Sequence, residues 1–405
     1  GKRGEHIVNI NFAAVDRTLE NLHEVTVPDT AEGSEEMASV VPDEAPEFVK
    51  NVTAVMMQGE GDTLPVSAIP PDGTFPTATT QWEKRNVGLE IPIWEKEICI
   101  QCGKCSLYCP HATIRMKAYN EEVLKDAPEA FQSIKARGRE FPDGTVFTVQ
   151  VAPEDCTGCG VCVNSCPAKN KKDPGRKAIN MQTKPPVKDR ERQNYEFFLR
   201  LPDYDRDTLK VHTVKGSQLL RPLFEYSGAC AGCGETPYIK LLTQLLGDRL
   251  LISNATGCTS IYGGNLPTTP YARDLQGRGP AWSNSLFEDS AEFGLGMRLA
   301  VDKQTEFARE LLRERSGEVD QSLANAILEA DVSSEQGITA QRERMIELKA
   351  ALSSLTDPGA QMLAGLADYL VPKSVWCIGG DGWAYDIGFG GLDHVMASGR
   401  NINLL

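Results

Sequence analysis

Two copies of one cysteine pattern constrain this chain more than any other feature. The copies read CIQCGKCSLYCP and CTGCGVCVNSCP, and each spaces its four cysteines as C-x-x-C-x-x-C-x-x-x-C-P. The eight cysteines are Cys99, Cys102, Cys105, Cys109, Cys156, Cys159, Cys162 and Cys166.

This spacing is typical of a bacterial-type ferredoxin module, in which three thiolates of each run bind one [4Fe–4S] cluster and the fourth crosses to the other cluster. Each iron needs a soft thiolate ligand, and short loops let backbone N–H groups donate hydrogen bonds to the sulfurs. A pair of structural zinc sites is the alternative, but zinc sites seldom use this register followed by proline. The pattern therefore predicts electron transfer.

Composition excludes several classes of protein. The chain has 405 residues, 41% of them hydrophobic and 24% charged, as in an ordinary globular protein of two or three domains. No apolar run reaches the roughly 18 residues of a membrane span, and the start lacks a signal-peptide layout. A net charge of −14 argues against nucleic acid as a partner. Cluster thiolates need a reducing compartment, so we expect a cytoplasmic protein without disulfides.

The first 86 residues read as connecting material. Residues 1–28 place apolar residues at alternate positions (Val8, Ile10, Phe12), then show a helical pattern over 13–22, which is too little for a core. Residues 29–86 are rich in Pro, Glu, Gly and Thr. This composition predicts an arm that is either disordered or draped over other domains.

The cluster domain is expected over residues 87–205. The 46 residues between Cys109 and Cys156 leave room for a helix over 120–136 and a strand over 145–151. Alternation of apolar residues predicts two strand pairs, 89–92 with 114–117 and 147–151 with 178–182.

Residues 206–405 show strands that alternate with helices, which indicates an α/β domain with a parallel sheet and sites at the strand carboxyl ends. Strands are expected at 250–252 and 375–378, and residues 401–405 read as the start of a buried strand. Helices are expected at 236–246, 291–314, 318–329, 341–355 and 361–370.

A second thiolate set lies in this part. Cys230 and Cys233 in SGACAGCGETPY and Cys258 in NATGCTSIYGG offer three ligands. The fourth is either Cys377, which sits in an apolar run where cysteine usually behaves as a small hydrophobe, or a residue beyond Leu405. A zinc knuckle is the alternative, and the eight cysteines upstream favour a third redox centre instead.

Gly380-Asp381-Gly382 follows an apolar strand and precedes an expected helix. Glycines let the backbone approach a diphosphate, and an aspartate oxygen suits Mg²⁺. A three-residue turn is a weak signal alone, and the preceding strand strengthens it.

Five motifs in order resemble those of the pyruvate:ferredoxin (flavodoxin) oxidoreductases, multidomain enzymes that use thiamine diphosphate. They are CIQCGKCSLYCPHATIR, CTGCGVCVNSCPAKN, GACAGCGETPY, NATGCTSIYGGNLPTTPY and GGDGWAYDIGFGGLDHVMASG. The resemblance implies a C-terminal-half fragment: the tail of a preceding domain, a connecting arm, a 2[4Fe–4S] domain and the first part of a thiamine diphosphate domain.

The resemblance also implies roles for particular residues. Asp381 would bind Mg²⁺ with Gly380 and Gly382 around the diphosphate, and Phe287 would pack against the thiazolium unless it is a core aromatic. Three [4Fe–4S] clusters are implied: one on Cys99, Cys102, Cys105 and Cys166, one on Cys156, Cys159, Cys162 and Cys109, and a proximal one on Cys230, Cys233 and Cys258.

The implied reaction is the oxidative decarboxylation of pyruvate with coenzyme A, in which ferredoxin or flavodoxin accepts the electrons. A homodimer and further domains of the same polypeptide are implied partners, and the 405 residues alone are expected to be inactive. Two alternatives remain open, namely another 2-oxo acid such as 2-oxoglutarate or an indolepyruvate as substrate, and a non-catalytic polyferredoxin.

Overall fold

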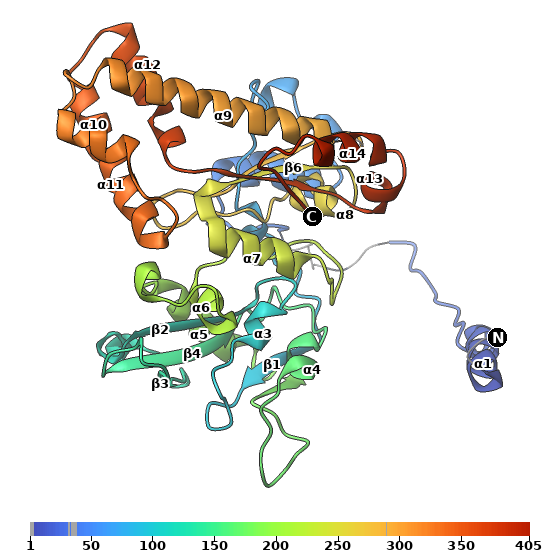
Figure 1. Cartoon of the computed structure of the whole chain (residues 1–405). Coiled ribbons are helices and arrows are strands. Elements are labelled where there is room, and N and C mark those ends of the chain that lie inside the picture. Colours follow the sequence, from blue (N-terminus) through green and yellow to red (C-terminus); the bar gives the residue numbers. More distant parts are fainter. Residues whose placement is uncertain (1–3, 31–32, 34–38, 289) are drawn as a thin grey trace. The chain divides into compact units, whose positions relative to one another are not determined.

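The computed structural model describes residues 4–30, 33, 39–288 and 290–405 (Figure 1). It separates into two compact units, Gly1–Ser39 and Val40–Leu405. The first unit contains helix α1 (Glu5–Glu20), in which no residue is buried. The alternating segment predicted at its start is wrong, because helix α1 includes it. Apolar residues at Val8, Phe12, Val15 and Leu19 follow the helical spacing, which overrides the local alternation.

From residue 40 onward the described arm contains short helices and a small core of its own. It forms a π-helical turn (Val49–Thr53) and the short helix α2 (Ala54–Met57). The backbone N–H of Ala78 donates to the carbonyl of Tyr271 at 2.6 Å, so the end of the arm lies against the α/β part. A small core of its own contains Val41, Ala45, Val49 and Ala54. Of the two alternatives, the draped arm is therefore the one observed in the described residues.

The cysteine-rich part is built on two antiparallel sheets. Strand β1 pairs with β5 and β2 pairs with β4, while β3 lies on the other edge of β4. The bounds are β1 (Glu90–Trp94), β2 (Ile114–Asn120), β3 (Ile134–Lys135), β4 (Thr145–Val151) and β5 (Ile179–Thr183). The positions of β1, β2, β4 and β5 were predicted, but the predicted pairing is wrong. Strands β1 and β2, which flank the first cysteine run, pair with β5 and β4, which flank the second run, so the two halves interlock.

The helix expected over 120–136 is also wrong. A 3₁₀ helix (Glu121–Asp126) is followed by a loop and then by β3. Pro128 explains the break, because proline lacks the N–H and its ring clashes with the preceding turn. The helices of this part are α3 (Lys104–Leu107), α4 (Val161–Ser165), α5 (Lys188–Arg200) and α6 (Val214–Leu219).

The α/β part contains a four-stranded sheet in the order β7-β6-β8-β9, and every neighbouring pair is parallel. The strands are β6 (Leu250–Asn254), β7 (Ala281–Asn284), β8 (Ser374–Ile378) and β9 (Asn403–Leu404). The predicted strands at 250–252 and 375–378 are confirmed as neighbours. The final strand is confirmed as β9, although its two residues are half-buried rather than buried. The parallel sheet of the expected fold class is thereby confirmed.

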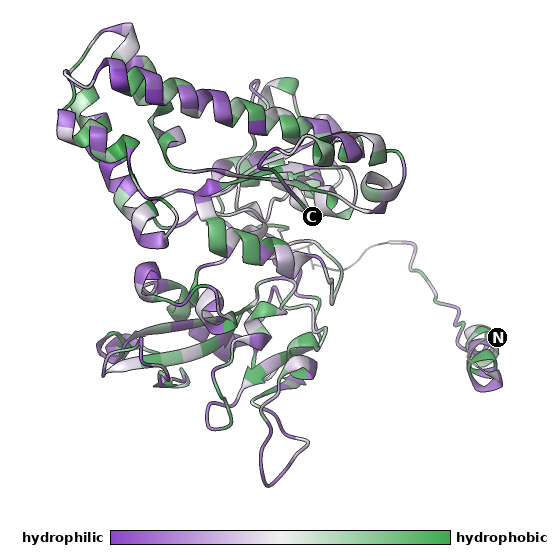
Figure 2. Ribbon diagram, in the orientation of Figure 1, coloured by the Kyte–Doolittle hydropathy of each residue, from purple (hydrophilic) through white to green (hydrophobic). Residues whose placement is uncertain are grey.

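Helices cover this sheet and form a separate core on α9. The bounds are α7 (Thr236–Leu246), α8 (Cys258–Ser260), α9 (Ala291–Glu314), α10 (Gln321–Leu328), α11 (Glu335–Leu352), α12 (Pro358–Leu366), α13 (Asp381–Tyr385) and α14 (Phe389–Ala397). Figure 1 shows α9 along the sheet with α10, α11 and α12 at its far end, and Figure 2 shows polar and apolar residues alternating around α9. Their shared core includes Leu312, Ile327, Leu348 and Leu363.

Three helices begin where capping side chains place them rather than where periodicity predicted. The Asp357 carboxylate accepts from the backbone N–H groups of Gly359 and Ala360, so α12 starts three residues earlier than expected. The Asp320 carboxylate accepts from the backbone N–H groups of Ser322 and Leu323, so α10 starts later than expected. The Ser334 hydroxyl accepts from Gly337 N–H, so α11 starts earlier. The predicted helices α7 and α9 have the expected bounds. The domain boundaries expected after residues 86 and 205 stay predictions.

Candidate redox and cofactor site

The first set of four cysteines surrounds one cavity. Cys166 of the second run joins three cysteines of the first run around a small cavity of about 20 Å³. The floor is apolar and includes Trp94 and Ile179. The lining cysteines are Cys99, Cys102, Cys105 and Cys166. The crossing of one cysteine between the two runs is thus a feature of the fold.

Burial and mutual repulsion act on these thiols. Burial raises the pKa of the Cys105 thiol to about 12, and the other three thiols of its set add to that shift. In the second set, burial raises the pKa of Cys156 to about 12, and neighbouring Cys109 and Cys159 raise it further. Burial and then Cys109 also raise the pKa of Cys162, which completes the second set. Without metal these thiols are neutral at pH 7, so a bound metal must displace their protons.

Donors point at the sulfurs of both sets. Gln101 N–H donates to Cys99 Sγ at 3.3 Å, and Thr113 Oγ1 lies 3.2 Å from Cys109 Sγ. Gly103 (φ 77°) and Gly160 (φ 72°) precede α3 and α4 in the left-handed conformation that turns each loop around its sulfurs. Among the described residues, no three Cys, His, Asp or Glu side chains converge closely enough to share a single metal ion. Cluster thiolates bind different irons and therefore stand farther apart.

Three loops gather at the carboxyl edge of the parallel sheet. The loop after β6 leads to Cys258 at the start of α8, and the loop after β7 carries Phe287. Thr256 N–H donates to the Phe287 carbonyl at 3.0 Å, which ties these two loops together. The loop after β8 carries Asp381, the first residue of α13. A Cβ on Gly382 would lie 2.1 Å from Glu288 Oε2, so the second and third loops are also in contact.

The side chains at this edge are open. Phe287 is 69% exposed, so it is not the core aromatic that was the alternative reading of this residue. Cys258 is exposed, and the Asp381 side chain makes no hydrogen bond or ion pair with the described residues. A Cβ on Gly380 would meet nothing within 4 Å. The edge therefore leaves room beside a glycine backbone and a carboxylate with free oxygens.

The Cys230–Cys233 turn lies between this edge and the second cysteine set. A Cβ on Gly232, inside the turn, would lie 3.9 Å from the Cys159 Cβ. On its other side, two residues after Cys233, the Glu235 carboxylate accepts from the Tyr262 hydroxyl at 3.1 Å. Burial raises the pKa of Tyr262, and the Glu235 carboxylate raises it further. Tyr262 belongs to the π-helical turn (Ile261–Asn265) that directly follows Cys258 and α8. The three cysteine groups thus follow one another in space toward the edge of the sheet.

His111 and Arg115 hold this turn in place, and the sequence did not single them out. Tyr226 N–H donates to the His111 carbonyl at 2.9 Å, and His111 Nδ1 lies 3.0 Å from the Ser227 carbonyl. The buried Arg115 guanidinium pairs with Glu225 and lies 4.9 Å from the Tyr226 ring centroid. Both residues fall in CPHATIR. For Arg115 the available signal was a charged residue inside an apolar strand, whereas His111 lies in the loop before β2 and had no such signal.

Lys240 on α7 is a further buried cation that was not predicted. Its Nζ donates to the Leu107 carbonyl at 3.1 Å and also to the Ser106 carbonyl at the end of α3. Burial lowers the pKa of this ammonium group to about 8; nearby Cys109 and Cys105 oppose that shift, and the Arg115 charge adds to it. A positive charge therefore lies beside both cysteine sets.

Cys377 lies away from the other cysteines' loops, inside β8. It is fully buried, and its Sγ lies 3.9 Å from the Ala291 carbonyl of α9. A Cβ on Gly294 would fall 2.0 Å from that sulfur. Cys377 is therefore packed as a small apolar side chain.

Comparisons with known proteins agree with this architecture. Residues 98–170 match the family described as a 4Fe-4S dicluster domain, and residues 34–88 match EKR, a domain of unknown function. The match and the interlocked cysteine sets agree on a 4Fe-4S dicluster domain over residues 98–170, joined in this chain to a parallel α/β sheet.

Full-length relatives identify the segment more closely. The chain is 57% identical to a pyruvate-flavodoxin oxidoreductase of Nostoc sp. and 52% identical to one of Rhodospirillum rubrum, in each case over 100% of the chain and 35% or 34% of the relative. It is 48% identical to a pyruvate:ferredoxin oxidoreductase of Moorella thermoacetica, over 100% of the chain and 34% of that protein. The chain is thus homologous over its whole length to one segment of the pyruvate-flavodoxin and pyruvate:ferredoxin oxidoreductases, and it spans about a third of the length of the curated relatives it matches.

Proposed function

We propose that this chain provides the electron-transfer part, and one wall of the thiamine diphosphate site, of an enzyme that oxidises pyruvate. Pyruvate and coenzyme A would give acetyl-CoA and CO₂, and two electrons would leave to ferredoxin or flavodoxin. The cofactors proposed are three [4Fe–4S] clusters, thiamine diphosphate and Mg²⁺. One observation carries the proposal: the Cys230–Cys233 turn lies against Cys159 on one side, and on the other side Glu235, two residues after Cys233, is hydrogen-bonded to Tyr262 in the turn after Cys258.

The open edge of the sheet fits a diphosphate and its metal. Asp381 has free carboxylate oxygens, which suit Mg²⁺, and the uncrowded Gly380 permits close approach of a diphosphate. The exposed Phe287 ring would stack on an aromatic ring held above this edge, because its backbone is fixed by Thr256. Thiamine diphosphate, when bound, supplies the carbanion and the electron sink that decarboxylation of a 2-oxo acid requires.

The chain's own residues would then perform two tasks. Asp381 would hold the Mg²⁺ that accompanies the diphosphate, while the loops after β6 and β7 would line the edge on which the cofactor rests. Cys230, Cys233 and Cys258 hold the first electron acceptor beside that edge, and the fourth ligand would come from sequence beyond Leu405. The two ferredoxin-type sets would receive electrons next, because a Cβ on Gly232 in the turn would lie only 3.9 Å from the Cys159 Cβ of the second set. No side chain here is proposed as a nucleophile.

Binding of thiamine diphosphate tests this proposal. In a longer protein that contains this chain and the residues after Leu405, calorimetric titration with thiamine diphosphate and MgCl₂ should detect a site. Asp381→Asn should weaken binding by at least about tenfold, as loss of metal-site groups generally does. Asp386→Asn is the control, because Asp386 is exposed in the same segment. Absence of binding to the parent protein would favour the non-catalytic polyferredoxin instead.

The substrate and the setting are further proposals. Assay of the longer protein with pyruvate, 2-oxoglutarate and indolepyruvate distinguishes the substrates, and higher kcat/KM for pyruvate is expected. A cytoplasmic homodimer remains our expectation. None of the helices in the described part has the length and apolar content needed to cross a bilayer. Turnover of pyruvate by the 405 residues alone would contradict the expected need for additional domains.

A further inference from the structure

A basic hairpin follows directly on the second cysteine run. Residues 169–177 read KNKKDPGRK, with five cationic residues and a single acidic one in a chain whose net charge is −14. In Figure 1 it forms part of the green loop that extends from the end of α4. The cationic residues are Lys169, Lys171, Lys172, Arg176 and Lys177.

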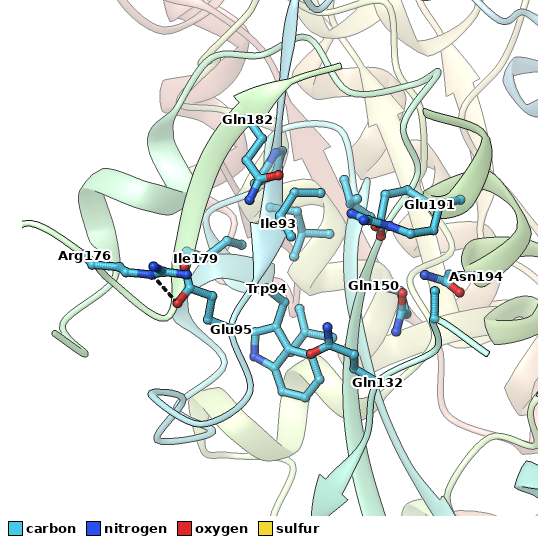
Figure 3. A pocket seen from close by; sticks show the side chains of 16 residues that line it. Ile93, Trp94, Glu95, Gln132, Gln150, Arg176, Ile179, Gln182, Glu191 and Asn194 are labelled. Atoms are coloured by element: carbon cyan, nitrogen blue, oxygen red, sulfur yellow. Dashed lines mark hydrogen bonds and ion pairs between the residues drawn. The ribbon is translucent and has the colours of Figure 1, made fainter. Parts of the chain in front are cut away.

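The base of this hairpin is fixed by specific contacts. Lys169 and Lys177 form an antiparallel bridge, and Asn170 N–H donates to the Arg176 carbonyl at 2.8 Å. Arg176 Nε lies 2.6 Å from Glu95 Oε2, the ion pair drawn in Figure 3. Asn180 Nδ2 donates to the other oxygen of that carboxylate at 2.6 Å. The hairpin is therefore anchored to the end of β1 and presents its tip in a defined direction.

Three lysines on the hairpin are free. The side chains of Lys169, Lys171 and Lys172 are exposed and form no hydrogen bond or ion pair with any described residue. Arg176 and Lys177, in contrast, are held by Glu95 and by the Val163 carbonyl. The free ammonium groups thus lie on one arm of the hairpin and reach its tip, where an acidic partner could neutralise them.

The hairpin lies beside the first cysteine set. Lys169 is three residues after Cys166, whose side chain lines the four-cysteine cavity with Cys99. Ile100, next to Cys99, is 50% exposed and gives this surface an apolar spot. Trp94 and Ile179 line both this cavity and the pocket of Figure 3, whose rim carries Arg176. Only one layer of side chains therefore separates the first cysteine set from the surface around the base of the hairpin.

We propose that the basic hairpin and Ile100 form the docking surface for an acidic electron-carrier protein. The proposal rests on the proposed function, which supplies the electrons. Opposite charges steer a carrier to the surface and raise the rate of encounter, while an apolar centre allows close contact. In each encounter the carrier is reduced by one electron and this protein is oxidised by one. A merely solvated charged loop is the ordinary alternative, and it predicts no effect on the carrier.

The test compares a protein carrier with a small acceptor. In the longer protein, pyruvate-dependent reduction of purified flavodoxin is measured beside that of methyl viologen, which needs no docking surface. The triple variant Lys169→Gln, Lys171→Gln, Lys172→Gln should raise the KM for flavodoxin about tenfold at low salt and flatten its dependence on NaCl. The rate with methyl viologen should change less than about twofold, because the cysteine sets are untouched.

Two further comparisons keep the outcome decisive. Lys125→Gln is the control, because Lys125 is an exposed lysine outside the hairpin that has no side-chain partner in the described structure. Its KM for flavodoxin should equal that of the parent, whereas Lys169→Gln, Lys171→Gln and Lys172→Gln should each raise this KM. An unchanged KM for flavodoxin in the triple variant overturns the docking proposal while the proposed function stands. If the parent reduces neither acceptor, the proposed function is wrong. Calorimetric binding of oxidised flavodoxin to the parent and the triple variant then decides docking, with equal affinities against it.

Discussion

The residues that hold the three cysteine groups together are mostly buried charges rather than the cysteines themselves. Arg115 is buried in β2, and its guanidinium pairs with Glu225 between the rings of Tyr195 and Tyr226. The two tyrosine hydroxyls are 2.7 Å apart, which closes the cluster. Because Glu225 leads directly into the segment before Cys230, this ion pair fixes where the Cys230–Cys233 turn begins.

Loss of the Arg115 guanidinium should destabilise the fold strongly. Arg115→Met leaves the Glu225 carboxylate without its buried partner, a change that typically costs about 3–5 kcal/mol. The midpoint of guanidinium-induced unfolding should fall accordingly. Lys303→Met is the control, because it removes an exposed ion pair to Glu306 and should leave the midpoint nearly unchanged. Equal effects of the two variants would show that the buried pair has no special role.

Lys373, just before β8, should make stability depend on pH. Burial lowers the pKa of its ammonium group below the usual 10.5, and Asp248 and Asp368 only partly oppose that shift. The unfolded chain therefore binds this proton more tightly, and the penalty is present at neutral pH and disappears as pH rises toward 10.5. Lys373→Met should stabilise the protein more at pH 7 than at pH 10, as measured by denaturant unfolding. A gain that is the same at both pH values would contradict this assignment.

At the scale of elements, local sequence signals predicted where the strands lie better than which strands pair with one another. The apolar alternation located β2 and β4, and the apolar runs located β6 and β8. Their pairing depends on how distant halves of the chain interlock, which no local pattern records. Strand β7 was missed because AWSN is short and half polar. Helix α5 was missed because its buried stripe (Glu191, Asn194, Tyr195, Phe198) includes polar residues.

Because the two cysteine runs share their sets, replacing the fourth cysteine of one run should make the cysteines of the other run reactive. In Cys166→Ser, the cavity that loses a ligand is the one lined by the first run. After reconstitution with iron and sulfide, iodoacetamide should label Cys99, Cys102 and Cys105 faster than in the parent, with the sites mapped by mass spectrometry. The second run should stay protected, since Cys109 completes its set.

Cys109→Ser is the matched variant and should give the opposite pattern. Its second-run partners Cys156, Cys159 and Cys162 should become reactive, while the first run stays protected. Labelling confined to the same run as each substituted cysteine would contradict the crossing.

At the scale of the molecule, the cysteine ligands could be predicted because their spacing is local. The ferredoxin-type runs and the glycine–aspartate turn can each be recognised within a few residues. The contact between the Cys230–Cys233 turn and Cys159 could not, because it joins segments some 70 residues apart through Arg115 and His111. Burial of these two residues is decided by tertiary packing, which composition does not reveal.

The central claim is that a proximal cluster on the Cys230–Cys233 turn lies next to the dicluster module. In a longer protein that includes the residues after Leu405, three [4Fe–4S] clusters should give about twelve iron atoms per chain. The most direct measurement is electron paramagnetic resonance during stepwise reduction. The signal of the proximal cluster should split by magnetic coupling once the second set is reduced, and Cys230→Ser should abolish that splitting. About eight iron atoms and no coupling would contradict the account.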